Sequence, residues 1–85
     1  HDIRVNAIGP GSIATDMLNV VMQDESARRT ILSRTPMGRA GDPSEVASVA
    51  VFLASDYASY VTGQTLYPDG GRLALNYTVP LRGDG

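Results

Sequence analysis

The sequence contains no cysteine, no tryptophan and no lysine, and its one histidine is His1. Without cysteine neither a disulfide nor a thiolate metal site can form, and one histidine cannot make a histidine-based metal cluster. We therefore expect no metal site. A chain of 85 residues is also small. Folds of this size usually gain stability from disulfides or a metal, and this chain offers neither.

The chain also lacks a strong charge of either sign, since its formal net charge is −2. The longest positive run, Arg28-Arg29, is typical of a solvated helix face, whereas nucleic-acid binding needs a basic stripe. No apolar stretch approaches the ~20 residues that span a bilayer. The residues before the strand-like segment 3–6 lack an apolar core, so we expect no secretory signal. We expect no nucleic-acid or membrane partner, a cytoplasmic location and a chain cut from a longer protein.

Two segments have the composition of short strands. Residues 3–8 place apolar, largely β-branched side chains at positions 3, 5, 7 and 8. The run Gly9-Pro10-Gly11 ends this pattern, because proline has no amide for a ladder. Residues 63–67 form the second expected strand, and helical segments separate the two. This order predicts a βαβ crossover with parallel strands.

The clearest predicted helix covers residues 42–55. Asp42 suits its N-cap, Pro43 its first helical position, and Glu45 completes a capping box. Its apolar residues extend beyond one stripe, so the helix must be covered on more than one side. Residues 16–34 predict either two short helices or one broken helix.

The predicted chain is of the α/β class, and it cannot cover itself. Two parallel strands with helices on them leave sheet faces and edges without partners. The sequence therefore predicts that the chain needs either the rest of a larger sheet or another subunit.

Residues 9–14 formally match the dinucleotide fingerprint G-x-G-x-x-A. Two observations argue against that assignment. Pro10 removes an amide that would face a phosphate, and the acidic residues near the expected offset, Asp24 and Glu25, lie in a helical segment. An independent mononucleotide-binding unit would rest on this match alone, and a glycine-rich turn is the interpretation that we prefer.

Three longer motifs are more specific. They are Ile-Arg-Val-Asn-Ala-Ile-Gly-Pro-Gly-Ser-Ile-Ala-Thr-Asp-Met over residues 3–17, Gly-Arg-Ala-Gly-Asp-Pro-Ser-Glu-Val-Ala over 38–47 with Val-Phe-Leu-Ala-Ser over 51–55, and Tyr-Val-Thr-Gly-Gln-Thr-Leu-Tyr-Pro-Asp-Gly-Gly over 60–71. Their order and spacing resemble short-chain dehydrogenases/reductases, in particular the 3-oxoacyl-carrier-protein reductases and glucose 1-dehydrogenase-like members. The resemblance implies the C-terminal βαβ portion of a doubly wound, parallel-sheet Rossmann fold, with its sixth and seventh strands.

The resemblance also implies a cofactor site for NAD or NADP. In this family the turn after the sixth strand flanks the nicotinamide, and the corresponding residues here are Pro10 and Gly11. Ile13 would lend backbone groups to the carboxamide, and Thr15 would hydrogen-bond the carboxamide or the pyrophosphate. The position fits, because ligands bind outside the carboxyl ends of parallel strands.

Residues 16–37 resemble the family's substrate lid, and residues 72–85 would form a C-terminal tail. The apolar lid residues that could line the nicotinamide pocket, or equally serve as ordinary packing, are Met17, Leu18, Val21 and Met22. The helix at 42–55 and the strand at 63–67 resemble the family's subunit interface, which implies a homodimer or homotetramer. The expected interface residues are Val46, Val49, Ala50, Phe52, Leu53, Leu66 and Tyr67.

We expect no catalytic residue in this chain. The family's phosphate-binding glycine turn, its Asn-Asn-Ala-Gly stretch and its catalytic Ser with Tyr-x-x-x-Lys are absent, and no tyrosine here can have a lysine partner. The whole protein implied is an NAD(P)-dependent oxidoreductase that passes hydride between nicotinamide and a small carbonyl or alcohol substrate. The segment alone would be inactive. The alternative is a non-catalytic interaction module or remnant that associates through its apolar helix.

Overall fold

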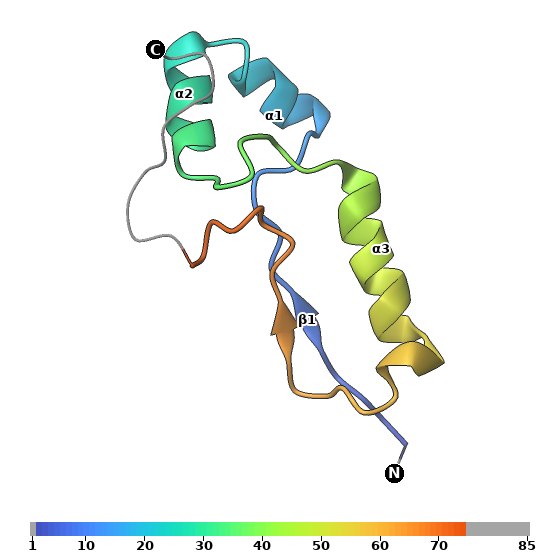
Figure 1. Ribbon diagram of the computed structural model, residues 1–85. Helices are drawn as coiled ribbons and strands as arrows, with labels where there is room; N and C mark the ends of the chain where they lie inside the picture. Colours follow the sequence, from blue (N-terminus) through green and yellow to red (C-terminus); the bar gives the residue numbers. More distant parts are fainter. Residues whose placement is uncertain (1, 75–85) are drawn as a thin grey trace.

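The computed structural model describes residues 2–74, so most of the expected tail at 72–85 lies outside the described residues. The elements are β1 (Ala7–Ile8), α1 (Asp16–Val21), α2 (Glu25–Ser33), α3 (Pro43–Ala54), the 3-10 helix η1 (Asp56–Ala58) and β2 (Thr65–Leu66). The two strands pair in parallel, which confirms the predicted βαβ arrangement. Figure 1 shows α3 running alongside the strand pair, with α1 and α2 beyond the carboxyl ends of the strands.

The regular strands are shorter than the ranges 3–8 and 63–67 that the sequence predicts. On the amino-terminal side of the two strands, side-chain hydrogen bonds replace part of the backbone ladder. Asn6 Nδ2 donates to Val61 O at 3.0 Å, and Gln64 N donates to Asn6 Oδ1 at 3.0 Å. A carboxamide offers a donor and an acceptor, as a peptide group does, so Asn6 joins the two segments without a regular ladder.

Residues 16–34 form two helices and not one broken helix. Thr15 caps α1 by accepting a hydrogen bond from Leu18 N at 3.3 Å, and Asp24 caps α2 by accepting one from Ser26 N at 3.3 Å. Each cap satisfies an amide that has no partner inside its helix. The second cap explains why α2 starts anew after α1 ends.

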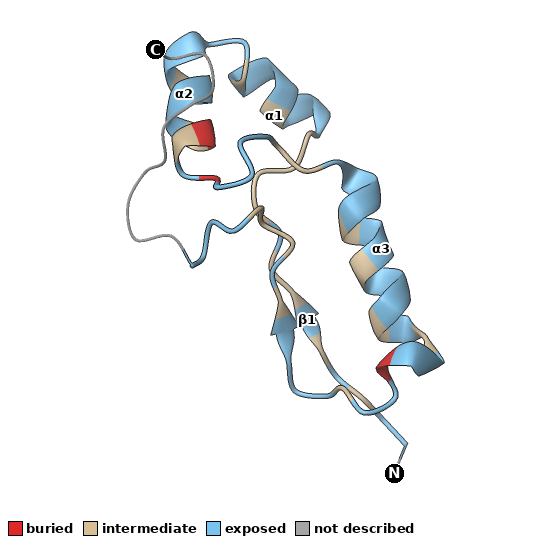
Figure 2. Ribbon diagram, viewed as in Figure 1, coloured by how far each residue is buried: buried red, intermediate tan, exposed pale blue. Residues whose placement is uncertain are grey.

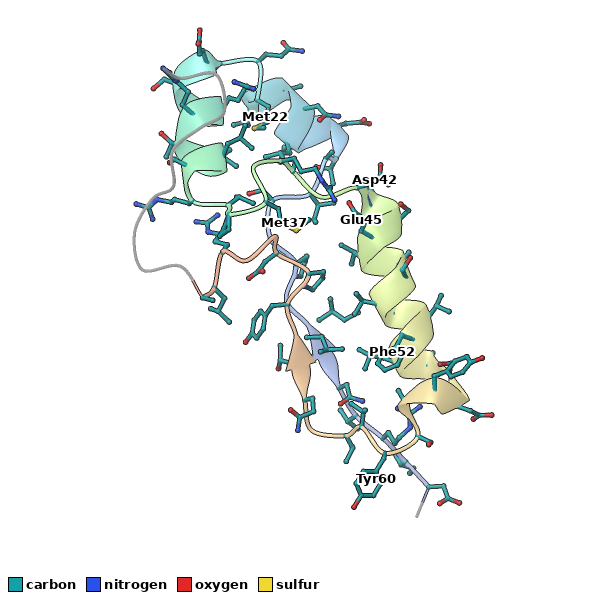
Figure 3. All side chains as sticks on the ribbon, viewed as in Figure 1. Met22, Met37, Asp42, Glu45, Phe52 and Tyr60 are labelled. Atoms are coloured by element: carbon teal, nitrogen blue, oxygen red, sulfur yellow. The ribbon has the colours of Figure 1, made fainter. Side chains whose placement is uncertain are left out.

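Helix α3 begins as the sequence predicts. Asp42 is its N-cap, and the side chain of Asp42 accepts a hydrogen bond from Ser44 N at 2.9 Å. Glu45 Oε1 accepts one from Asp42 N at 2.8 Å, so the capping box is complete. Figure 3 shows Asp42 and Glu45 together at this end of the helix.

Only part of α3 is covered within this chain. Val46, Val49 and Leu53 are half-buried, as is Ile8 of β1 beside them, whereas Ala50 of the predicted apolar stripe is exposed. The helical spacing of the three half-buried residues places them on one face. That face is the one that α3 turns toward the strands.

Few side chains are buried, as Figure 2 shows. Within residues 2–74 the buried apolar residues are Leu32 and Ala58, and large apolar side chains such as Val51, 69% exposed, remain open. This matches the expectation that the helices and strands need more partners than the chain provides. In the same range, no helix combines the length and the apolar character needed to cross a bilayer.

Candidate functional site

The loop after β1 lies beside the loop after β2, at the carboxyl ends of both strands (Figure 1). Gly9 N donates to Leu66 O at 2.8 Å, and Gly11 N donates to Pro68 O at 3.2 Å. Backbone pairing therefore continues beyond the ladder. Pro10 stands between the two donors, at a position that needs no amide for this pairing.

Two glycines allow these loops to approach closely. A Cβ on Gly11 would lie 2.8 Å from Asp69 Cα, and a Cβ on Gly9 would lie 2.6 Å from Tyr67 Cδ1. A side chain at Gly11 would therefore force the two loops apart, and one at Gly9 would displace the Tyr67 ring. The Tyr67 ring, expected at a subunit interface, thus also packs on Gly9 within this chain.

Ile13 lies in a short parallel bridge to Gly41. Ala14 N donates to Gly41 O at 2.7 Å, and Gly41 N donates to Ser12 O at 2.8 Å. The amide of Ile13 donates no hydrogen bond to any residue in the range 2–74. The bridge therefore holds Ile13 in place and leaves its N–H for another acceptor.

Thr15 has capacity for a ligand in addition to its capping role. Its hydroxyl offers one donor and two lone pairs, and the bond from Leu18 N uses one lone pair. Thr15 N donates to Ile13 O at 2.7 Å, which turns the chain back on itself. A free hydroxyl donor at Thr15 and a free amide at Ile13 thus occur two residues apart.

The four expected cofactor contacts lie on one turn, but they do not all face the same hollow. A groove of about 450 Å³ is lined by Gly9, Pro10, Gly11, Ser12, Tyr67, Asp69, Arg72 and Leu73. Ile13 lines a separate cavity of about 120 Å³ with Ser12, Glu45 of α3 and residues of the loops before α3 and after β2. Pro10 and Gly11 are therefore grouped, with Ile13 on the adjoining side of Ser12.

The four expected lid residues divide into two pairs. Met17 is 80% exposed and Val21 is 43% exposed, whereas Leu18 and Met22 are half-buried. Figure 3 shows Met22 between α1 and α2. Leu18 and Met22 are thus partly covered, whereas Met17 and Val21 remain available to other contacts.

Asp69 is a site residue to which the motifs alone assign no role. Its carboxylate accepts hydrogen bonds from Gly71 N and Leu73 N, both at 2.9 Å. Partial desolvation acts to raise the pKa of Asp69, but the amides of Leu73 and Gly71 lower it by more, so the pKa lies below its ordinary value. The run Asp-Gly-Gly directly after a strand is the signal that indicates such a turn, because aspartate commonly bonds the amide two residues further on.

No group of side chains suited to holding a metal ion occurs within residues 2–74. The donors at Ile13 and Thr15 are uncharged and suit an oxygen acceptor of an organic group. The arrangement as a whole is an α/β segment with a ligand-accessible turn at the carboxyl ends of parallel strands, as in doubly wound folds.

Comparison with known proteins identifies the class of this segment. A family model described as enoyl-(acyl carrier protein) reductase matches residues 1–72. The chain belongs to the short-chain dehydrogenase/reductase family and corresponds to the C-terminal region of its Rossmann fold.

Individual relatives agree. The chain is 57% identical over 71 residues to the 3-oxoacyl-acyl-carrier-protein reductase of Thermotoga maritima, covering 84% of this chain and 28% of that protein. It is 52% identical over 77 residues to the galactitol 2-dehydrogenase (L-tagatose-forming) of Cereibacter sphaeroides. That match covers 91% of this chain and 28% of the galactitol dehydrogenase.

A solved structure from Agrobacterium tumefaciens, described as a 2-deoxy-d-gluconate 3-dehydrogenase with bound NADP, matches with a TM-score of 0.82 at 45% identity. The match covers 86% of this chain and 30% of that one. The chain therefore spans less than a third of the length of these relatives.

Proposed function

We propose that this chain forms the nicotinamide side of the dinucleotide site in a longer NAD(P)-dependent oxidoreductase. That enzyme transfers hydride between the nicotinamide and a carbonyl or alcohol carbon of a small molecule. The observation that carries the proposal is the turn after β1, where the Ile13 amide and the Thr15 hydroxyl each keep a donor free of partners among residues 2–74. Relatives with bound NADP or with NAD(P) in their names support the choice of cofactor.

The residues of the turn fit a planar amide-bearing ring. The Ile13 N–H and the Thr15 O–H would donate to the carboxamide, which fixes the rotation of the ring. Pro10 and Gly11 line the groove after β1, where a flat ring could lie against the backbone. The bound cofactor supplies the hydride chemistry, and this chain binds and orients it.

Helices α1 and α2 would form the lid over the substrate. The exposed side chains of Met17 and Val21 give the lid an apolar surface, and Met22 lies between its two helices (Figure 3). A closed apolar lid excludes water and orients the substrate. The proton donor and acceptor would come from the remainder of the enzyme, since this chain has no lysine to pair with a tyrosine.

Helix α3 and strand β2 would form the subunit interface of a homodimer or homotetramer. The supporting observation is a shallow apolar groove between them, lined by Ser48, Val49, Phe52, Leu66, Tyr67 and Pro68. Figure 3 shows the Phe52 side chain on α3, where it is 41% exposed. A two-fold contact would use this same patch on both partners.

The test uses the full-length protein that contains this chain. Binding of NADH and NADPH is measured by nicotinamide fluorescence, and turnover by reduced-nicotinamide absorbance with secondary alcohols, sugar alcohols and a 3-oxoacyl thioester. We expect saturable binding of at least one dinucleotide and turnover of at least one substrate class. A folded full-length protein that binds neither dinucleotide would contradict the proposal.

A further inference from the structure

Asp69 lies between two parts of the proposed site, the nicotinamide turn at residues 9–15 and the base of the lid at residues 35–37. On the side of the turn, the contact is made by its backbone. A Cβ on Gly11 would come within 2.8 Å of Asp69 Cα, and Gly11 N donates to Pro68 O, next to Asp69, at 3.2 Å. The nicotinamide turn therefore rests directly on the main chain at this position.

The carboxylate of Asp69 binds the backbone of the residues that follow it in the chain. Its Oδ1 accepts from Gly71 N and its Oδ2 accepts from Leu73 N, each at 2.9 Å. Between them, Gly70 and Gly71 have φ angles of +65° and +95°. Two successive glycines in such conformations make a flexible segment, and the two charge-assisted hydrogen bonds hold it in one shape.

This turn supports the base of the lid. Met37 N donates to Gly70 O at 3.0 Å, and a Cβ on Gly70 would lie 2.7 Å from Thr35 Cγ2. Thr35 is only 4% exposed, and its hydroxyl donates to Ile31 O at 3.0 Å, at the end of α2. A continuous set of contacts thus runs from Asp69 through Gly70 to the second helix of the lid.

We propose that Asp69 is a positioning residue that couples the nicotinamide turn to the substrate lid: its backbone supports Gly11, and its carboxylate holds the turn on which the lid base rests. The proposal rests on the function proposed above. The lowered pKa of Asp69 agrees with a carboxylate that stays ionised at neutral pH and so accepts both hydrogen bonds. Because the backbone contact survives a change of side chain, loss of the carboxylate should loosen the lid more than the cofactor turn.

The kinetic test compares Asp69→Asn with Asp56→Asn in the full-length protein. Asparagine keeps the shape but cannot accept through its NH₂ group, so one of the two hydrogen bonds is lost. Asp56 is an exposed carboxylate on η1, away from the turn, and serves as the matched control. For Asp69→Asn we expect the KM for substrate to rise about tenfold while the Kd for the dinucleotide changes less than about twofold. Equal losses in both constants, or no change in either, would overturn the coupling role.

A second test needs no activity. Hydrogen–deuterium exchange of Asp69→Asn should be faster than in the unmodified protein at residues 25–37 and 70–73, and unchanged at 43–54. Uniformly faster exchange would mean general destabilisation, and unchanged exchange would mean that the carboxylate does not hold the lid base. Either result removes the proposal.

If Asp69→Asn does not fold, hydrogen–deuterium exchange of the unmodified protein with and without cofactor tests the coupling instead. Saturating NADP should slow exchange at residues 35–37 and 70–73 as well as at 9–15, and protection confined to 9–15 would overturn the coupling. If the protein binds no dinucleotide at all, the proposed function fails. The exchange comparison of Asp69→Asn with the unmodified protein still decides whether the carboxylate holds the lid base.

Discussion

Arg39 and Glu45 form a two-point ion pair, with Nη1 to Oε1 at 2.7 Å and Nη2 to Oε2 at 3.0 Å. Glu45 also accepts the hydrogen bond from Asp42 N that closes the capping box of α3. The bond from Arg39 first, and that from Asp42 second, lower the pKa of Glu45 from 4.5 to about 2. One carboxylate thus joins the start of α3 to the loop before it.

Acid should weaken this junction. Because the folded-state pKa of Glu45 is depressed to about 2, its stabilising contribution is present above the unfolded value of 4.5 and is lost as the pH falls toward about 2. Glu45→Gln should therefore be less stable than the unmodified protein at neutral pH, and the difference should shrink between these two pH values. Denaturant unfolding at a series of pH values measures this difference in the free energy of unfolding. A difference that stays constant down to the lower pH would contradict the assignment.

Replacing Thr15 should affect both the helix cap and the proposed cofactor contact. Thr15→Val removes the acceptor for Leu18 N, which costs about 0.5–2 kcal/mol of stability. It also removes a hydroxyl donor, so kcat/KM for the dinucleotide should fall by up to about tenfold. Thr15→Ser keeps the hydroxyl and should preserve both properties. Unfolding and steady-state kinetics of the two variants separate the effects, and full activity of Thr15→Val would remove Thr15 from the cofactor site.

The contact between Gly11 and Asp69 should be intolerant of a methyl group. A Cβ on Gly11 would meet Asp69 Cα at 2.8 Å, whereas a Cβ on Gly41 would meet the mobile end of a side chain, Ile13 Cδ1, at 2.9 Å. Gly11→Ala should therefore destabilise the protein by about 1–3 kcal/mol, and Gly41→Ala by less, because Ile13 can change rotamer. Denaturant unfolding of the pair provides the comparison. Equal losses of stability in the two variants would show that the contact at Gly11 is no less tolerant of a methyl group than the contact at Gly41.

A charge on the apolar groove of α3 should disrupt the proposed subunit contact. Phe52→Asp places a carboxylate among Val49 and Leu66, where desolvation would be unfavourable without a partner. Thr30→Asp introduces the same charge on an exposed position of α2 and serves as the control. Sedimentation of the full-length variants should show a smaller species for Phe52→Asp only. An unchanged oligomer in both would place the interface elsewhere.

The isolated chain should bind dinucleotides weakly and should not turn over substrate. It carries donors for the nicotinamide end alone, and these few hydrogen bonds must also offset the entropy lost on association. We expect a Kd no better than about millimolar, near 4 kcal/mol, for NAD(H) and NADP(H) by calorimetry. Micromolar binding, or turnover by purified chain, would mean that the chain holds a complete site.

Local features of the fold could be predicted because they depend on neighbouring residues. The start of α3 follows from Asp42, Pro43 and Glu45, which act within one helical turn, and the structure confirms it. The choice between one broken helix and two helices was open, because a cap at Asp24 competes with helix continuation at similar cost. The predicted strands were too long, because a hydrophobic pattern does not reveal that Asn6 pairs with the second segment through its side chain.

The sequence by itself determined the family, the helix cap at Asp42 and the parallel βαβ order, since motif spacing and capping are local properties. The tertiary structure alone decided that Gly11 abuts Asp69, that Tyr67 packs on Gly9, and that Gly70 supports the lid base. These contacts join segments far apart in the chain, as Asn6 and Gln64 do across 58 residues. Their existence depends on where β2 returns beside β1, and the register of that return is set by packing of the whole segment.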